Sequence, residues 1–239
     1  MRFTVLASRA QVNRFLISLV LLLNLLSLIG QFTVYFLADF PSRDTFANRF
    51  NVDAEGSLPT VYSGLALLFS SILLALIGNA PQTKIARYAR KWKILSWVFL
   101  YLSLDELLGF HDLLNKPLRK FFNLSGFFHF SWVIPIGILV VILAISYIKF
   151  IFHLPLKVRI LFIVAGLVYV FGAIGLEMIN GNYAAVYGEK NFTYQLLVTI
   201  EEFLEMTGIV IFINALLYYM NLHSINEVYI ELFLKKSNN

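Results

Sequence analysis

The sequence predicts an all-α protein, a polytopic membrane bundle of six transmembrane helices with both termini in the cytoplasm. Three observations predict this class. Hydrophobic residues make up 59% of the chain and charged residues 14%, with a mean hydropathy of +0.76, far more apolar than a soluble protein. Apolar runs near the roughly 20 residues that a helix needs to cross a bilayer recur along the chain. Lys and Arg gather in alternate connections between these runs.

Each expected span is a long apolar run that ends at polar residues, Pro or Gly. In chain order the six spans cover 14–38, 60–80, 94–115, 131–152, 160–180 and 195–220, within one membrane domain of residues 1–239. The first run is too long for the apolar core of a signal peptide and lacks a small-residue cleavage pattern. We therefore expect this segment to remain in the protein as its first transmembrane helix.

The distribution of basic residues predicts the orientation. Six basic residues fall on one side of the expected bundle: Arg43, Arg49, Lys116, Arg119, Lys120 and Lys190. The other 13 of the 19 fall on the opposite side, which the positive-inside rule makes cytoplasmic. The net charge of +5 thus reflects topology, and we expect membrane lipid and no nucleic acid as a partner. The absence of Cys excludes disulfides and thiolate ligands.

Two further features bear on how the bundle packs. The longest outer connection, Asp39–Pro59, carries charges of both signs and either folds over the mouth of the bundle or is a solvated connector. Small residues of the fifth span would allow close approach of another helix: Gly166, Gly172, Ala173 and Gly175.

Half of the acidic residues, seven of 14, fall inside the expected spans: Asp105, Glu106, Asp112, Glu177, Glu201, Glu202 and Glu205. A charged acid at the centre of a membrane helix costs roughly 2.5–3.5 kcal/mol on insertion scales. Such residues usually face the interior of a bundle and mark a functional site.

The direction of the helices places all seven acids at similar depth. The third and fifth spans run outward and carry their acids toward their C-terminal ends, whereas the sixth runs inward and carries its acids toward its N-terminal end. In the sixth span, Glu205 lies four residues after Glu201 and three after Glu202, so all three can face one cavity. In the third span, a continuous helix aligns Asp105 with Asp112, and a bend at Gly109 would change this.

No Lys or Arg lies in the outer halves of the spans that carry the acids. The acids must therefore be neutralised by protons, by a bound cation or by basic residues that fold back over the spans. We expect an O and N ligand set for a divalent metal such as Fe, Mn or Zn, of open identity. Its members are Glu106, His111, Asp112, Glu177, Glu201 and Glu205. Glu202 and Asp105 are the expected catalytic acid–base residues. The Glu-x-x-His spacing of bundle di-iron sites is absent.

A structural alternative needs no ligand. Neutral buried acids can hydrogen-bond across helices and hold them together. The candidate partners are Tyr101, Ser103, Asn180 and Thr207.

The segments Leu102–Asp112 and Thr199–Gly208 resemble a group of bacterial multi-span membrane proteins of unknown function. The group shares an Asp-Glu pair followed by His and an acidic residue, and an E-E-x-x-E-M-x-G signature. The resemblance implies one constellation of these residues in a bacterial plasma membrane, and it implies no activity. A fainter similarity to ceramidase-type membrane hydrolases rests on Ser103, Asp105 and His111, and the His-x-x-x-His of those enzymes is absent.

Three functions fit these observations. The first is a metal-dependent enzyme acting on a lipid-like or quinone-like substrate that enters from the outer leaflet. The second is a cation or proton transporter or channel. The third is an assembly or cofactor-binding subunit of a membrane complex. The inner halves of the spans lack acids, which favours a one-sided pocket over a path through the membrane.

Overall fold

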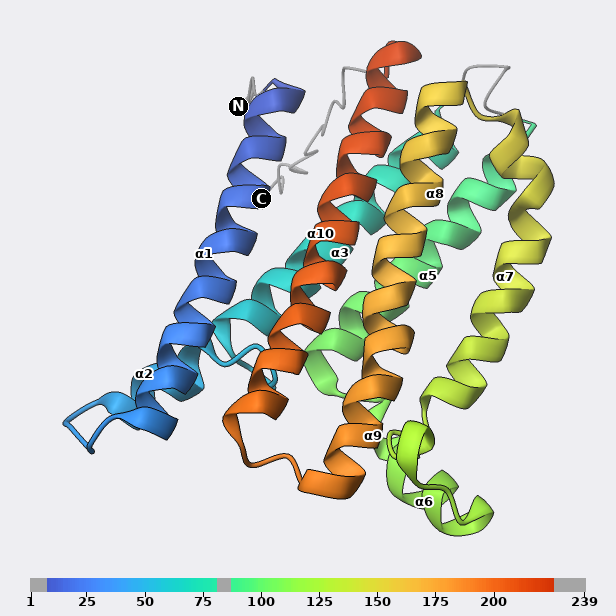
Figure 1. Cartoon of the computed structure of the whole chain (residues 1–239). Coiled ribbons are helices and arrows are strands. Elements are labelled where there is room, and N and C mark those ends of the chain that lie inside the picture. The colour runs from blue at the N-terminus through green and yellow to red at the C-terminus, as the bar shows by residue number, and fades with distance from the viewer. Residues whose placement is uncertain (1–7, 81–86, 226–239) are drawn as a thin grey trace, which may run out of the picture.

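All regular structure that is described is helical. The computed structural model describes residues 8–80 and 87–225, and no β-strand occurs among them. Its elements, in chain order, are α1 (Arg9–Phe36), α2 (Arg43–Phe50), α3 (Leu58–Asn79), α5 (Ala89–Leu108), α6 (Asp112–Phe122), the 3-10 helix η1 (Gly126–Phe128), α7 (Val133–His153), α8 (Leu156–Val170), the π-helix η2 (Phe171–Leu176), α9 (Glu177–Tyr187) and α10 (Phe192–Leu222). The long helices run alongside one another as a bundle (Figure 1). The all-α prediction is confirmed.

Several helices are suited to cross a membrane. In the part of the chain that is described, four segments are long and apolar enough: α1, α3, α7 and the continuous run from α8 to α9. A fifth is obtained if α5 and α6 are counted as one bent span. The expected range 160–180 lies inside the longer run Leu156–Tyr187. These lengths and compositions agree with an integral membrane protein.

The third expected span, 94–115, is wrong at its C-terminal end. Helix α5 stops at Leu108 because Gly109 adopts a left-handed backbone with φ of 58°. The chain then turns by 85° into α6. Asp112 therefore does not share a helix face with Asp105.

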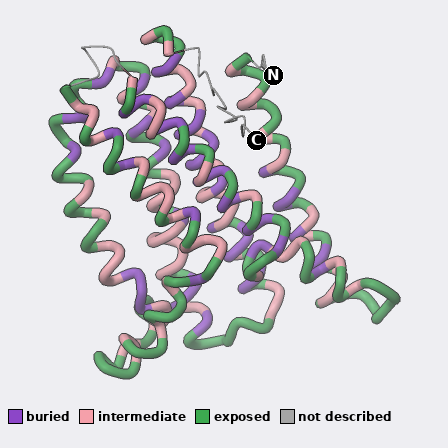
Figure 2. Tube along the Cα trace, turned by 180° about the vertical axis from the view of Figure 1, so that it is seen from behind, coloured by how far each residue is buried: buried purple, intermediate pink, exposed green. Residues whose placement is uncertain are grey.

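Helix α10 occupies the centre of the bundle, where it contacts α1, α3, α8 and α9. The end of the bundle that holds the C-terminal end of α10 is closed by aromatic packing. Trp92 is fully buried there, with its ring centroid 4.8 Å from those of both Phe150 and Tyr219. This end is densely packed and contributes most of the hydrophobic core. Buried stretches of chain gather among the helices in the middle of the bundle (Figure 2).

Helix α7 joins the bundle only near its two ends. Val133 is buried at one end, and Tyr147 and Phe150 are buried at the other. The residues between Val133 and Tyr147 are exposed or only partly buried. The middle of α7 therefore stands away from its neighbours (Figure 1).

Glycine permits close approach of α10 to the α8–η2 segment. A methyl group at Gly208 would lie 2.9 Å from the backbone nitrogen of Tyr169, and one at Gly172 would lie 3.1 Å from the carbonyl oxygen of Glu201. Gly166 has nothing within 4 Å of its methyl position, so its expected role in packing is wrong.

The connection between α1 and α3 folds back onto the bundle. Helix α2 packs along the end of α1, where a methyl group at Gly30 would lie 3.0 Å from the Cα of Ala47. The backbone N–H of Val52 donates to Ser27 Oγ at 3.3 Å. This segment holds Asp53 near the acidic cluster described below.

Candidate functional site

Glu177 and Glu201 form the best-partnered part of the acidic cluster. The indole N–H of Trp132 donates to Glu177 Oε1 at 2.8 Å, and the amide of Asn180 donates to Glu201 Oε2. The carboxyl groups of Glu177 and Glu201 also lie within hydrogen-bonding reach of each other. Two carboxyl groups this close are stable when they share a proton or a cation.

The π-helix η2 aims Glu177 at α10. Its wider turns, over Phe171–Leu176, change the register of the chain directly before Glu177. Gly172 lies within this turn and lets the backbone approach Glu201 and Glu205. Single π-turns inside longer helices are frequent at functional sites.

Glu106 brings α5 into the same cluster. Its carboxyl group is close enough to interact electrostatically with both Glu202 and Glu205 of α10. The hydroxyl of Tyr169 on α8 hydrogen-bonds to Glu205. Three helices thus contribute acids to one region.

Asp105 and His111 form a hydrogen-bonded pair at the bend between α5 and α6. His111 Nδ1 lies 2.9 Å from Asp105 Oδ2, and the backbone N–H of His111 donates to Asp105 Oδ1 at 3.0 Å. A carboxylate at Nδ1 favours the tautomer that leaves Nε2 as an acceptor. The imidazole ring lies 4.9 Å from the ring of Trp132, centroid to centroid, which connects this pair to Glu177.

Asp53 lies at the outer edge of the cluster, where its carboxyl group hydrogen-bonds to the side chain of Gln195. Desolvation raises the pKa of Asp53 to about 6 although the residue keeps exposed surface. The hydrogen bond from Gln195 opposes this shift, and the charges of Glu189 and Asp112 add to it. Nothing in the sequence distinguishes Asp53 from the other charged residues of its loop.

The predicted residues divide into three groups. Glu201 is buried, with 7% of its surface exposed. The acids that converge with it are partly buried: Glu106, Glu177, Glu202 and Glu205. Asp105 and His111 adjoin this group as a pair. Asp112 lies at the start of α6 with its side chain 56% exposed, and its Oδ1 is 3.7 Å from Nε2 of His111.

Three partners of the cluster were not predicted: Trp132, Tyr169 and Gln195. Nothing in the sequence distinguishes the two aromatic residues, because aromatic side chains are common at membrane interfaces and in packed helix contacts. Asn180 was anticipated as a hydrogen-bond partner, and it does donate to Glu201. Ser103 instead donates to the carbonyl oxygen of Gly64 at 2.7 Å.

The arrangement of the described side chains does not support the predicted divalent metal. Within residues 8–80 and 87–225, no three Asp, Glu or His side chains are placed to hold one ion. Their oxygens face Trp132, Asn180 and Tyr169 instead. The metal stays a prediction from the sequence, and elemental analysis of the parent beside a Glu201→Ala, Glu205→Ala variant tests it. Near-stoichiometric metal in the parent alone would establish the site.

The helices and this cluster define a class: a helical membrane bundle that carries buried carboxyl groups in one half. A family described as "Domain of unknown function (DUF8692)" matches residues 15–220, and the chain belongs to this family. The match runs from α1 into α10 and includes every residue of the cluster. Neither a curated protein nor a solved structure matches the chain.

Proposed function

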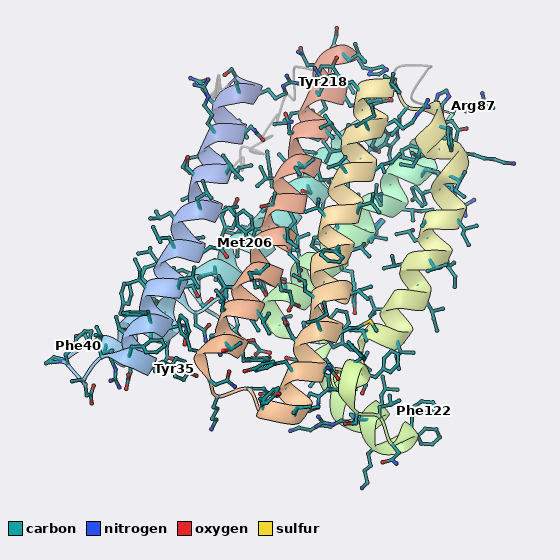
Figure 3. All side chains as sticks on the ribbon, in the orientation of Figure 1. Tyr35, Phe40, Arg87, Phe122, Met206 and Tyr218 are labelled. Carbon is teal, nitrogen blue, oxygen red and sulfur yellow. The ribbon has the colours of Figure 1, made fainter. Side chains whose placement is uncertain are left out.

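We propose that the chain crosses the membrane six times with both termini in the cytoplasm. The α7–α8 connection, the start of α1 and the end of α10 lie at one end of the bundle (Figure 1). Basic residues of the described chain gather at this end, among them Arg87, which lies far from Tyr35 and Phe122 (Figure 3). Helix α10 has 31 residues and is about 46 Å long, enough to be the sixth span. The acidic cluster then faces outward, in what the resemblance suggests is a bacterial plasma membrane.

The proposed activity is general acid–base chemistry on the polar end of a lipid-like molecule. The Asp105–His111 pair carries this proposal, because Asp105 orients the imidazole and Nε2 is left to accept a proton. Glu106 and Glu177 are close enough to interact electrostatically with His111 and can supply or accept a second proton. Glu202 interacts electrostatically with Glu106 and so connects to the pair through that residue.

Lateral access from the bilayer supports a lipid-like substrate. Apolar side chains of α5 and α8 are exposed, including Tyr101 and Leu167. An open apolar groove of about 450 Å³ runs along α7 and is lined by Phe128, Ile134, Gly137, Ile138, Val141 and Ile142. The groove begins close in sequence to Trp132, which binds Glu177. An amphiphile can therefore place its chain against α7 with its polar end near the cluster.

Lipid profiling of reconstituted protein tests the proposed activity. The purified chain is incubated in liposomes made from a bacterial lipid extract, and products are followed by mass spectrometry. We expect lipid species to change with the parent and the rate to fall 10²–10⁴-fold in His111→Gln. His153→Gln is the matched control, since His153 lies at the other end of the bundle, with its ring centroid 4.7 Å from that of Tyr88. An unchanged lipid profile, or full activity of His111→Gln, would contradict the proposal.

A second candidate is a proton or cation path. It is favoured by buried polar atoms that lack a protein hydrogen-bond partner among the described residues, including Asn180 Oδ1, Gln195 Oε1 and Thr207 Oγ1. Such atoms are usually satisfied by water, which would link the acids into a chain. Proton uptake into liposomes with a pH-sensitive dye distinguishes the two functions. Flux that is lost in Glu205→Gln, with no lipid product, would favour transport.

A further inference from the structure

Helix α6 is divided into an apolar and a polar face. At 100° per residue, every apolar side chain falls on one side: Leu113, Leu114, Pro117, Leu118, Phe121 and Phe122. The polar side chains fall on the other: Asp112, Asn115, Lys116, Arg119 and Lys120. None of these residues is buried. A helix with this pattern needs an apolar environment on one side.

The bend at Gly109 gives α6 its orientation. Because α5 is a spanning helix in the proposed topology, a turn of 85° lays α6 close to the membrane plane at the outer surface. Its polar face is fixed to the protein, where Asn115 Oδ1 accepts from the backbone N–H of Trp132 at 3.1 Å and Arg119 lies 3.1 Å from His129. The apolar face consequently points away from the bundle.

The exposed surface of α6 matches the surface of a bilayer. Leu113 is 70% exposed and Phe121 81% exposed, and Phe122 projects from the edge of the molecule (Figure 3). Lys116 and Lys120 are exposed on the adjacent side and form no ion pair among the described residues. Large aromatic residues beside free cations are the pattern of a helix that lies in the interface of an anionic membrane.

We infer that α6 is an interfacial helix that inserts its apolar face into the outer leaflet and binds anionic phospholipid headgroups through Lys116 and Lys120. The occupant is a lipid surface, since the cations flank an apolar strip and the helix lies across the bundle. Docking of α6 holds the adjoining His111 at the depth of the headgroups. The inference does not depend on the proposed chemistry, because its test measures lipid contact.

The chain contains no Cys, so single-Cys variants can be spin-labelled directly. Labels at Leu113→Cys and Phe121→Cys are compared with labels at Lys116→Cys and Lys120→Cys, in vesicles of phosphatidylglycerol and phosphatidylcholine. We expect the first pair to be accessible to oxygen and shielded from a water-soluble nickel chelate, and the second pair to show the reverse. Lys190→Cys in an exposed loop is the control for water. Nickel access at positions 113 and 121 equal to that at 190 would overturn the inference.

The lipid preference gives a second readout that does not rely on labels in α6. The fraction of spin-labelled lipid whose motion the protein restricts is measured for phosphatidylglycerol and for phosphatidylcholine. The parent is compared with the double variant Lys116→Gln, Lys120→Gln. We expect the preference for phosphatidylglycerol to fall about fivefold for each lysine removed. Lys190→Gln is the matched control. An unchanged preference in the double variant would overturn headgroup binding.

Discussion

At the scale of single residues, the site depends on which donor satisfies each buried carboxyl group. Asn180 is fully buried and donates to Glu201, and Trp132 donates to Glu177. A buried polar group that loses its partner pays its desolvation cost without compensation. These donors are therefore as important to the site as the acids.

Replacement of Asn180 by Leu should destabilise the protein by about 1–3 kcal/mol, because it removes the buried amide that donates to Glu201 Oε2. Unfolding in mixed detergent micelles measures the change. Asn79→Leu is the control, since Asn79 is exposed and bonds only to the carbonyl oxygen of Ala75 in its own helix. Equal stability of the two variants would contradict the assigned role of Asn180.

The pKa of Asp53 predicts a dependence of stability on pH. The folded value of about 6 is above the ordinary value of 3.8, so the folded state binds the proton more tightly. Stability is therefore highest below pH 3.8 and falls as the pH rises through about 6. Thermal unfolding in detergent should show that Asp53→Asn removes this fall, whereas Asp44→Asn, an exposed acid of the same connection, keeps it. A parent whose stability is flat over this range would refute the prediction.

The acids themselves could be identified from the sequence because carboxyl groups are costly in lipid wherever they occur. Their partners could not. Trp132 lies 45 residues from Glu177 in the chain, and nothing in the sequence near Trp132 distinguishes it from an interfacial anchor. Asp112 could share a helix face with Asp105 only in a continuous helix, and the bend at Gly109 removes that arrangement.

At the scale of elements, hydropathy predicts where the long helices lie but not where they bend. The turn after α5 depends on one left-handed residue, Gly109, and the π-helix before α9 depends on contact of Gly172 with α10. Both features are local changes in backbone geometry inside apolar sequence. Both also direct functional side chains, His111 in one case and Glu177 in the other.

The close contact at Gly208 predicts that replacing this glycine by Ala will affect stability differently from the same replacement at Gly166. Gly208→Ala should destabilise the bundle by about 1–3 kcal/mol, because the new methyl group would meet the backbone of Tyr169 at 2.9 Å. Gly166→Ala, which meets nothing within 4 Å, should stabilise α8 by about 0.5–1 kcal/mol. Unfolding in mixed micelles measures both. A loss of stability in Gly166→Ala as large as that in Gly208→Ala would show that helix contact is not the cause.

At the scale of the whole molecule, the two ends of the bundle differ. Aromatic packing around Trp92 closes one end, whereas the other end carries the acids, where Trp132 donates to Glu177. Within the described chain, the helices carry no acid at the closed end. This asymmetry suits a site that opens to one side of the membrane.

The proposed topology predicts which exposed positions are reached from outside. Lys190→Cys and Lys157→Cys place single thiols at opposite ends of the bundle. In intact cells a membrane-impermeant maleimide should label position 190 and not position 157, which should become reactive only after permeabilisation. Labelling in the reverse order would invert the orientation and place the acidic cluster on the cytoplasmic side.

The most direct test of the central claim is cross-linking of a Glu106→Cys, Glu205→Cys variant with an impermeant bifunctional thiol reagent added from outside. These positions lie on α5 and α10, and their carboxyl groups interact in the folded chain. We predict a cross-link between the two helices within one chain, and none in a control with Glu106→Cys and Ile148→Cys, since Ile148 is exposed on α7. Failure to cross-link, or a cross-link that forms only when the reagent is inside, would contradict an outward-facing site built from these helices.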